Sequence, residues 1–172
     1  MNKKLEYIVM KYLNTEVTFR EFPDEISLCI NISNCRFQCE GCHSPELWEN
    51  NGTELTQSEL GKLIDSNEGI TCVGFMGGKP DVINTLAQYI KENYPNLRIG
   101  WYWGGTSIPG EIKILNFDYI KIGPYIKEKG GLDNPNTNQV FYAKGKYVDK
   151  PDASPNSLYD VTYKFYGSKY NN

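Results

Sequence analysis

The sequence lacks long apolar runs, and no stretch approaches the roughly 18 residues that a membrane-spanning helix needs. It has a single histidine, and its 18 basic residues are scattered instead of forming one stripe. We therefore expect no membrane span and no nucleic-acid-binding face. The beginning, MNKKLEYIVMKYL, is basic, but Glu6 and Lys11 interrupt its apolar run and no small-residue cleavage site follows, so we expect no signal peptide.

What the sequence does contain is typical of an ordinary globular domain. Its 172 residues are 40% hydrophobic and 23% charged, with a net charge of −3. This length suffices for one hydrophobic core, so we predict a single domain over residues 1–172. We expect a cytoplasmic protein, and in that reducing compartment its five cysteines favour metal or redox chemistry over disulfides.

Apolar patterning predicts alternating strands and helices. A helix over residues 56–67 begins with a T-x-x-E capping box, formed by Thr56 and Glu59, and a second helix begins at Pro80. This order indicates βαβ units, and therefore an α/β fold with a mainly parallel open sheet. The predicted strands cover residues 26–32, 69–76, 97–103 and 117–123.

The remainder of the chain is predicted to extend this sheet. Residues 128–139 are expected to form a loop, residues 139–150 a hairpin, and residues 158–166 a final strand. The domain would thus consist of a core of about residues 26–143 and a β-rich tail over residues 144–172.

Each early strand is followed by cysteines or glycines, in the segments NCRFQCEGC, GGKP, WGGT and GPY. The carboxyl ends of parallel strands commonly carry the active site. We therefore expect these four segments to lie along one edge of the sheet, which Lys121 could also face.

Three cysteines in the stretch NCRFQCEGCHSPELW have the spacing C-x-x-x-C-x-x-C. They are Cys35, Cys39 and Cys42. Structural zinc needs four ligands, and here the fourth could only be His43, Cys29 or Cys72. His43 is adjacent to the third cysteine, whereas Cys29 and Cys72 lie within apolar strands where small buried packing is the alternative role. There is also no second C-x-x-C pair, as a zinc ribbon would have.

A [4Fe–4S] cluster normally takes four cysteines, so three would leave one iron with an open position. We therefore favour a three-cysteine [4Fe–4S] cluster over zinc as the occupant of this loop.

At these residues the sequence resembles the radical S-adenosylmethionine (SAM) superfamily. More narrowly, CRFQCEGCHSPELW is similar to the activating proteins of anaerobic ribonucleotide reductases, which usually have glycine at the position of Gly41. The resemblance continues through CVGFMGGKP, WYWGGT, DYIKIGPYIKE with NTNQVFY, and DVTYKFY, and covers roughly residues 26–166.

The resemblance implies a partial (βα) barrel and an activating enzyme. A reduced cluster would cleave SAM, and the resulting 5′-deoxyadenosyl radical would create a glycyl radical on the anaerobic (class III) ribonucleotide reductase. The electron donor would be a low-potential protein such as flavodoxin or ferredoxin. No catalytic residue is implied beyond the cluster and SAM. The implied cofactor-binding residues are Gly41, Cys42, His43, Met76, Gly77, Gly78, Asp81 and Trp103.

Several of these residues have simpler alternative roles. The glycine pair could be a plain strand-to-helix turn, His43 a polar loop residue, and Trp103 part of the core. The sequence also departs from the family at Lys79, where an acid usually follows the two glycines. A lysine cannot accept a hydrogen bond from the SAM ammonium group, but Asp81 could.

Two other functions fit the sequence. One is a radical SAM synthase of a small molecule, of the deazapurine type, which should enclose its substrate. The other is a non-catalytic zinc- or iron–sulfur-binding module, with which Lys79 is compatible.

Overall fold

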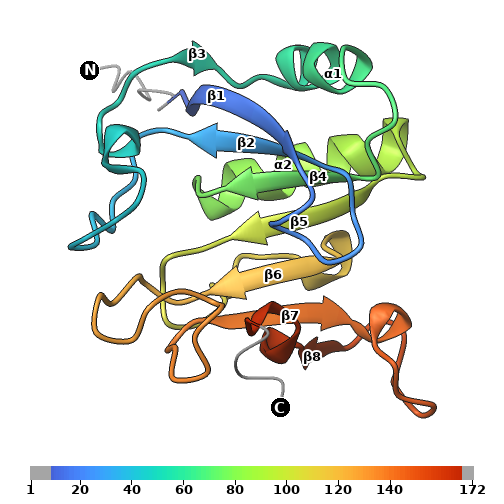
Figure 1. Cartoon of the computed structure of the whole chain (residues 1–172). Coiled ribbons are helices and arrows are strands. Elements are labelled where there is room, and N and C mark those ends of the chain that lie inside the picture. The colour runs from blue at the N-terminus through green and yellow to red at the C-terminus, as the bar shows by residue number, and fades with distance from the viewer. Residues whose placement is uncertain (1–8, 168–172) are drawn as a thin grey trace.

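The computed structural model describes residues 9–167, which form a mixed eight-stranded sheet with the strand order β3-β1-β2-β4-β5-β6-β7-β8 (Figure 1). Residues 1–8, which begin the segment compared with a signal peptide, lie outside this range. Residues 168–172, at the end of the predicted tail, also lie outside it. The strands are β1 (Lys11–Thr18), β2 (Ser27–Ile32), β3 (Thr53–Glu54), β4 (Cys72–Met76), β5 (Arg98–Tyr102), β6 (Tyr119–Ile122), β7 (Val140–Lys144) and β8 (Leu158–Asp160). The helices are α1 (Gln57–Asp65) and α2 (Pro80–Asn93), with short 3₁₀ segments η1 (Pro45–Trp48), η2 (Ile114–Asn116), η3 (Gly145–Tyr147) and η4 (Thr162–Phe165).

The sheet is parallel at its centre and antiparallel on both sides. β2, β4, β5 and β6 pair in parallel, whereas β1, β3, β7 and β8 are joined by antiparallel pairs. The four predicted parallel strands are therefore present, but the whole sheet is mixed where we expected a mainly parallel one. The partial (βα) barrel stays a prediction.

The strand β1 is absent from the sequence-based prediction. Its side chains do not alternate cleanly between buried and exposed, because it lies near the edge of the sheet between β2 and the two-residue β3. It is also tied to α1, since the hydroxyl of Tyr12 donates a hydrogen bond to Glu59 Oε1 at 2.7 Å. The buried core also includes Met10, Phe22 and Val161, which lie outside the predicted core of residues 26–143.

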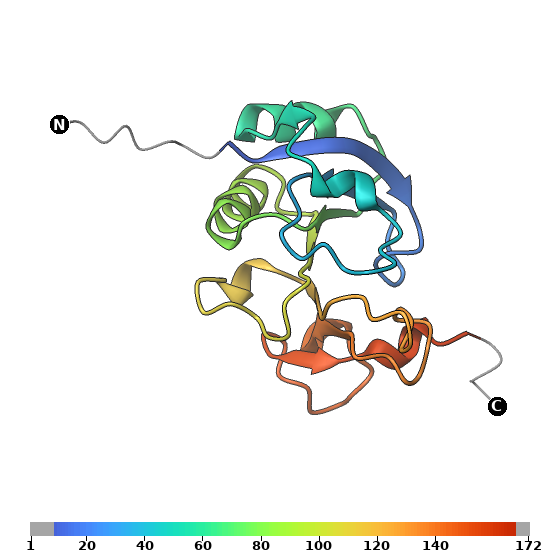
Figure 2. The ribbon, with the colours of Figure 1, turned by 90° about the vertical axis from the view of Figure 1, so that its left-hand side faces the viewer.

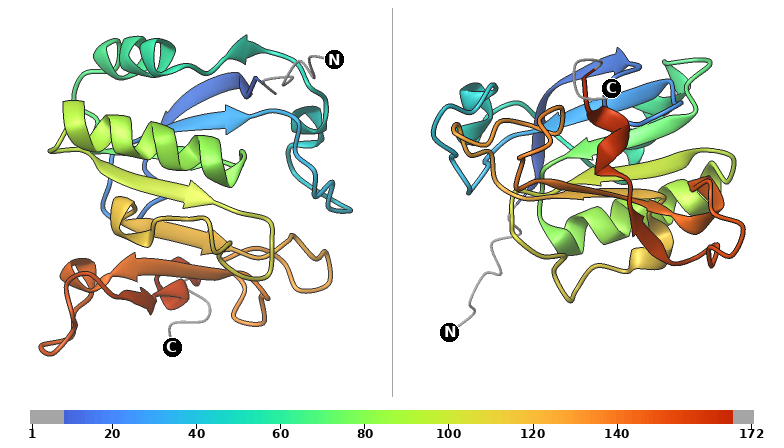
Figure 3. Two further views of the ribbon diagram at one scale, coloured as in Figure 1. Left: turned by 180° about the vertical axis from the view of Figure 1, so that it is seen from behind. Right: turned by 60° about the horizontal axis from the view of Figure 1, so that its bottom comes forward.

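Both α-helices pack on one face of the sheet, and α2 lies in front of the strands, roughly along their direction, when the molecule is seen from behind (Figure 3, left). The predicted cap of α1 is present, since Thr56 Oγ1 accepts a hydrogen bond from Glu59 N at 3.1 Å. The side chains buried between these helices and the sheet include Leu60, Ile64, Ile83, Leu86, Ile90, Val73, Phe75, Ile99 and Trp101.

No helix between residues 9 and 167 is both long enough and apolar enough to cross a membrane.

The opposite face of the sheet is built around Phe22, which is fully buried. Beneath its ring, Cys29, Gly74 and Gly100 stand in register on three neighbouring strands. A Cβ atom at either glycine would collide with this ring. The two glycines therefore leave the space that Phe22 fills.

A buried ion pair stabilises the end of the sheet where the parallel strands begin. Glu25 is 3% exposed, and its carboxylate accepts hydrogen bonds from Thr71 Oγ1 at 2.5 Å, Arg98 Nη1 at 3.0 Å and the Tyr119 hydroxyl at 2.7 Å. A buried carboxylate with three donors is well compensated. This end of the sheet is thus occupied by a structural network, which leaves the opposite edge for the functional site.

We predict that Gly100→Ala lowers the free energy of unfolding by about 1–3 kcal/mol in urea denaturation, because the new methyl group overpacks the Phe22 pocket. Gly110→Ala is the control, since a Cβ there meets nothing within 4 Å, and its effect should stay within about 0.5 kcal/mol. Equal losses in both variants would show that the space beside Phe22 is not restrictive.

Candidate iron–sulfur site

Four parallel strands end level with one another at one edge of the sheet. In the pairing register, Asn31 lies beside Met76, Met76 beside Tyr102, and Tyr102 beside Lys121. Figure 2 looks onto this edge, from which the cysteine loop and the loops after β4, β5 and β6 project. The structure thus brings together the four segments that the sequence places after these strands.

The cysteine loop is closed at its base by backbone hydrogen bonds. Asn34 N donates to Glu49 O at 3.0 Å, and Cys35 N donates to Leu47 O at 2.9 Å. The returning chain forms η1, which Pro45 starts. The cysteines therefore lie on a loop whose two ends are joined by backbone hydrogen bonds.

The three loop cysteines face one cavity of about 510 Å³. Cys35, Cys39 and Cys42 are half-buried free thiols, and Cys42 Sγ accepts a hydrogen bond from Ser44 N at 3.4 Å. Other predicted residues line the same cavity, namely Met76, Gly77, Gly78, Asp81 and Trp103. Two predicted residues, Gly41 and His43, do not line it.

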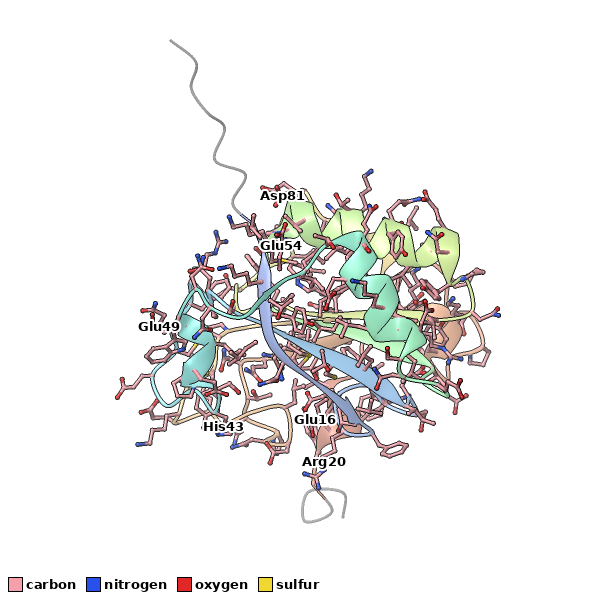
Figure 4. The ribbon with its side chains drawn as sticks, turned by 90° about the horizontal axis from the view of Figure 1, so that it is seen from above. Glu16, Arg20, His43, Glu49, Glu54 and Asp81 are labelled. Atoms are coloured by element: carbon pink, nitrogen blue, oxygen red, sulfur yellow. The ribbon has the colours of Figure 1, made fainter. Side chains whose placement is uncertain are left out.

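Gly41 and His43 lie against Tyr125 of the loop after β6. The His43 ring centre is 5.1 Å from that of Tyr125, and a Cβ at Gly41 would stand 3.4 Å from Tyr125 Cε1. In Figure 4, His43 on the cysteine loop is well separated from Asp81 at the start of α2. The contact of Gly41 and His43 is with the neighbouring loop, and a role beside SAM stays a prediction for both.

Phe37 fastens the cysteine loop to the end of β5. Its ring meets the Trp103 ring edge-on at 4.8 Å, and it occupies the space above Gly104, where a Cβ would come within 2.5 Å of Phe37 Cδ2. Arg36 lies over the face of Trp103, with 4.8 Å from its Cζ to the ring centre. Neither Phe37 nor Arg36 is among the site residues predicted from the sequence, although both lie between Cys35 and Cys39.

Trp103 is itself nearly buried, with 6% exposed. One face stacks on Trp101 at 5.1 Å, while Arg36 and Phe37 cover other parts of its ring. These contacts are those of a core residue at the cavity wall, which was the alternative role considered for it. A role beside adenosine stays a prediction for Trp103.

The glycine pair after β4 has a backbone that other residues rarely adopt. Gly77 and Gly78 have φ angles of +105° and +99°, and both fall in the left-handed region. The turn is held by two hydrogen bonds, from Gly77 N to Tyr102 O at 3.1 Å and from Trp101 Nε1 to Gly77 O at 2.9 Å. Its shape is therefore fixed by β5 and not by the glycines alone.

Lys79 and Asp81 follow this turn at the start of α2. Lys79 is the N-cap residue and makes no side-chain capping bond, and Asp81 is exposed in the first helical turn. Both line the cavity. One carboxylate and one lysine thus line the cavity immediately after the glycine pair.

Lys121 enters the cavity from β6, as its position in the sequence allowed. Burial lowers the pKa of Lys121 to about 8, and the charges of Cys39 and Glu21 act in the opposite direction. Its Nζ donates a hydrogen bond to Gly123 O at 3.3 Å and lies 5.3 Å from the centre of the Tyr102 ring.

The other two cysteines lie outside the cavity. Cys29 and Cys72 are 3% and 0% exposed. Burial, with a smaller contribution from nearby carboxylates, raises the pKa of Cys29 to about 12 and the pKa of Cys72 well above its usual value. Thiols of this kind are poor metal ligands, because the ligand form is the thiolate.

The donor set fits a cluster with three protein ligands. Within residues 9–167, no group of three or more His, Cys, Asp or Glu side chains converges on a single-ion site. A [4Fe–4S] cluster does not require such convergence, because each thiolate binds a different iron atom. Three free thiols around one cavity supply what this cluster needs.

The chain belongs to the family of 4Fe-4S single cluster domains, whose model matches residues 26–116. No curated protein and no solved structure matches the chain. The matched region contains all five cysteines and extends from β2 to η2. The protein is therefore an iron–sulfur protein, and the match supports the predicted [4Fe–4S] cluster over zinc.

We predict that anaerobic reconstitution yields about four irons and about four sulfides per chain, and that Cys35→Ala, Cys39→Ala and Cys42→Ala each lose most of this iron. Cys29→Ala and Cys72→Ala are matched controls, because their thiols are buried away from the cavity. Iron and sulfide analysis, with the visible absorption of the cluster, measures the outcome. Loss of iron in either control with a normally folded chain would contradict the three-ligand assignment.

Proposed function

We propose that this protein is a radical SAM activating enzyme that generates a glycyl radical on an anaerobic ribonucleotide reductase in the cytoplasm. The observation that carries the proposal is the position of the three loop thiols, on the same cavity as Met76, Gly77 and Gly78. Three protein ligands leave one iron of a [4Fe–4S] cluster open to a further ligand. The resemblance to reductase-activating proteins at these segments supports SAM as that ligand.

When bound, the reduced cluster and SAM would supply the radical chemistry, namely one-electron reductive cleavage of SAM, with the electron from a protein such as flavodoxin or ferredoxin, and removal of a hydrogen atom from a glycine of the partner. The protein contributes binding, orientation and exclusion of water. Cys35, Cys39 and Cys42 would hold the cluster, and the turn at Gly77 and Gly78, which line the same cavity without side chains, would let the methionine part of SAM approach the backbone closely.

Asp81 is our candidate acceptor for the SAM ammonium group. It lines the cavity one turn away from Gly78, whereas Lys79, at the position of the usual acid, can only donate hydrogen bonds. In this proposal the acceptor lies two residues after the position of the usual acid, in the first turn of α2.

We expect the reconstituted, dithionite-reduced protein to form 5′-deoxyadenosine from SAM, and to give a glycyl-radical signal in electron paramagnetic resonance (EPR) when the partner reductase is present. The Cys42→Ala variant should form neither, because the cluster loses a ligand. A protein that holds its cluster but never forms 5′-deoxyadenosine would instead be an iron–sulfur-binding module. Formation of 5′-deoxyadenosine with turnover of a small molecule and no glycyl radical would favour the synthase alternative.

We also predict that Asp81→Ala weakens SAM binding to the cluster-loaded protein about tenfold or more, because a charge-assisted hydrogen bond is lost. Glu92→Ala, at the far end of the same helix, is the control and should leave the affinity unchanged. Equilibrium dialysis with labelled SAM measures this directly. Unchanged affinity in Asp81→Ala would mean that the acceptor is elsewhere.

A further inference from the structure

The cavity that contains the loop cysteines has a charge opposite to that of the whole chain. The sequence has 21 acidic and 18 basic residues. Around the cavity this balance is reversed, because only Asp81 contributes a carboxylate. The basic residues that line it are Lys11, Arg36, Lys79 and Lys121.

These four cations are not neutralised by protein carboxylates. None of the ion pairs formed within residues 9–167 includes any of them. Arg36 lies over the Trp103 ring, and the Lys121 ammonium group donates to Gly123 O. Lys11 and Lys79 both line the cavity, and neither ammonium group makes a hydrogen bond or ion pair with another of the residues 9–167.

Lys11 and Lys79 belong to segments that meet beside the glycine pair. A Cβ at Gly78 would lie 2.9 Å from the sulfur of Met10 and 2.8 Å from Ile83 Cδ1, so the start of β1 and the start of α2 both contact this turn. Lys11 follows Met10, and Lys79 follows Gly78. Lys11 and Lys79 therefore belong to two segments that both contact the Gly78 turn and both line the cavity.

The proposed cofactors do not balance this charge. A reduced [4Fe–4S]⁺ core with three thiolates carries about −2, while SAM carries about +1. With Asp81 ionised, four cations and SAM still exceed the negative charges. A further anionic group would balance the remaining positive charge at the cavity.

We propose that this cavity recognises acidic side chains of the polypeptide substrate, with Lys11 and Lys79 as their binding partners. The proposal rests on the proposed function, and it names the chemistry of the substrate segment that carries the glycine. A cavity of about 510 Å³ is of the size that one drug-sized ligand fills. Once the cluster and SAM occupy it, the substrate must bind at its mouth, which suits an extended peptide better than an enclosed small molecule.

The test uses the cluster-loaded protein and fluorescent peptides with a central glycine, flanked either by glutamates or by the isosteric glutamines. We expect the glutamate peptide to bind about tenfold more tightly by fluorescence anisotropy, with the difference falling between about 0.01 M and about 0.15 M salt. Lys11→Gln and Lys79→Gln should each reduce that preference about three- to tenfold. Lys91→Gln is the control, because it is exposed on α2 and does not line the cavity.

Equal affinities for the two peptides would overturn the proposal, as would an equal loss of preference in Lys91→Gln. Displacement of the glutamate peptide by inorganic phosphate or ATP at lower concentration than by unlabelled peptide would also overturn it, by showing that the site takes a small anion. Cluster absorption and thermal unfolding show whether each variant is folded. Because binding is measured without turnover, an acidic preference without 5′-deoxyadenosine formation would reject the proposed function and not the recognition of acidic peptides.

Discussion

The candidate site depends on the parallel pairing of β2, β4, β5 and β6. Because neighbouring strands run in the same direction and end level with one another, the segments that follow them must emerge at the same edge. Cysteines, a glycine pair and a lysine that are far apart in sequence thereby surround one cavity. The antiparallel strands β1 and β7 flank this centre, and β1 adds Lys11 to the cavity wall.

The loops on this edge are held by contacts with the sheet, and this gives the site a defined shape before any ligand binds. Phe37 anchors the cysteine loop on Trp103, and Trp101 fixes the carbonyl of Gly77. A cluster held by only these three thiols would need such support, because the position of its open iron would be set by where the thiols are held. The same wall carries the uncompensated cations, so cofactor binding and substrate recognition would share one surface.

The parts of the structure that could be predicted from sequence are those encoded locally. The cap at Thr56, the helix start at Pro80 and the buried central strands follow from short patterns. The final strand ends earlier than predicted because the Asp160 carboxylate accepts hydrogen bonds from Thr162 N and Oγ1 and turns the chain into η4. Long-range contacts could not be predicted this way. Nothing in the sequence around Phe37 shows that it packs on Trp103 after β5, and nothing around Lys11 shows that it lines the cavity.

The central claim is that three cysteines hold a [4Fe–4S] cluster whose fourth iron binds SAM. It is tested most directly by the EPR spectrum of the reduced cluster, recorded with and without SAM. Direct coordination at the open iron should change the shape and position of the cluster signal, and decarboxylated SAM, which cannot chelate through its carboxylate, should not reproduce that change. A signal that SAM leaves unchanged at saturating concentration would contradict the account.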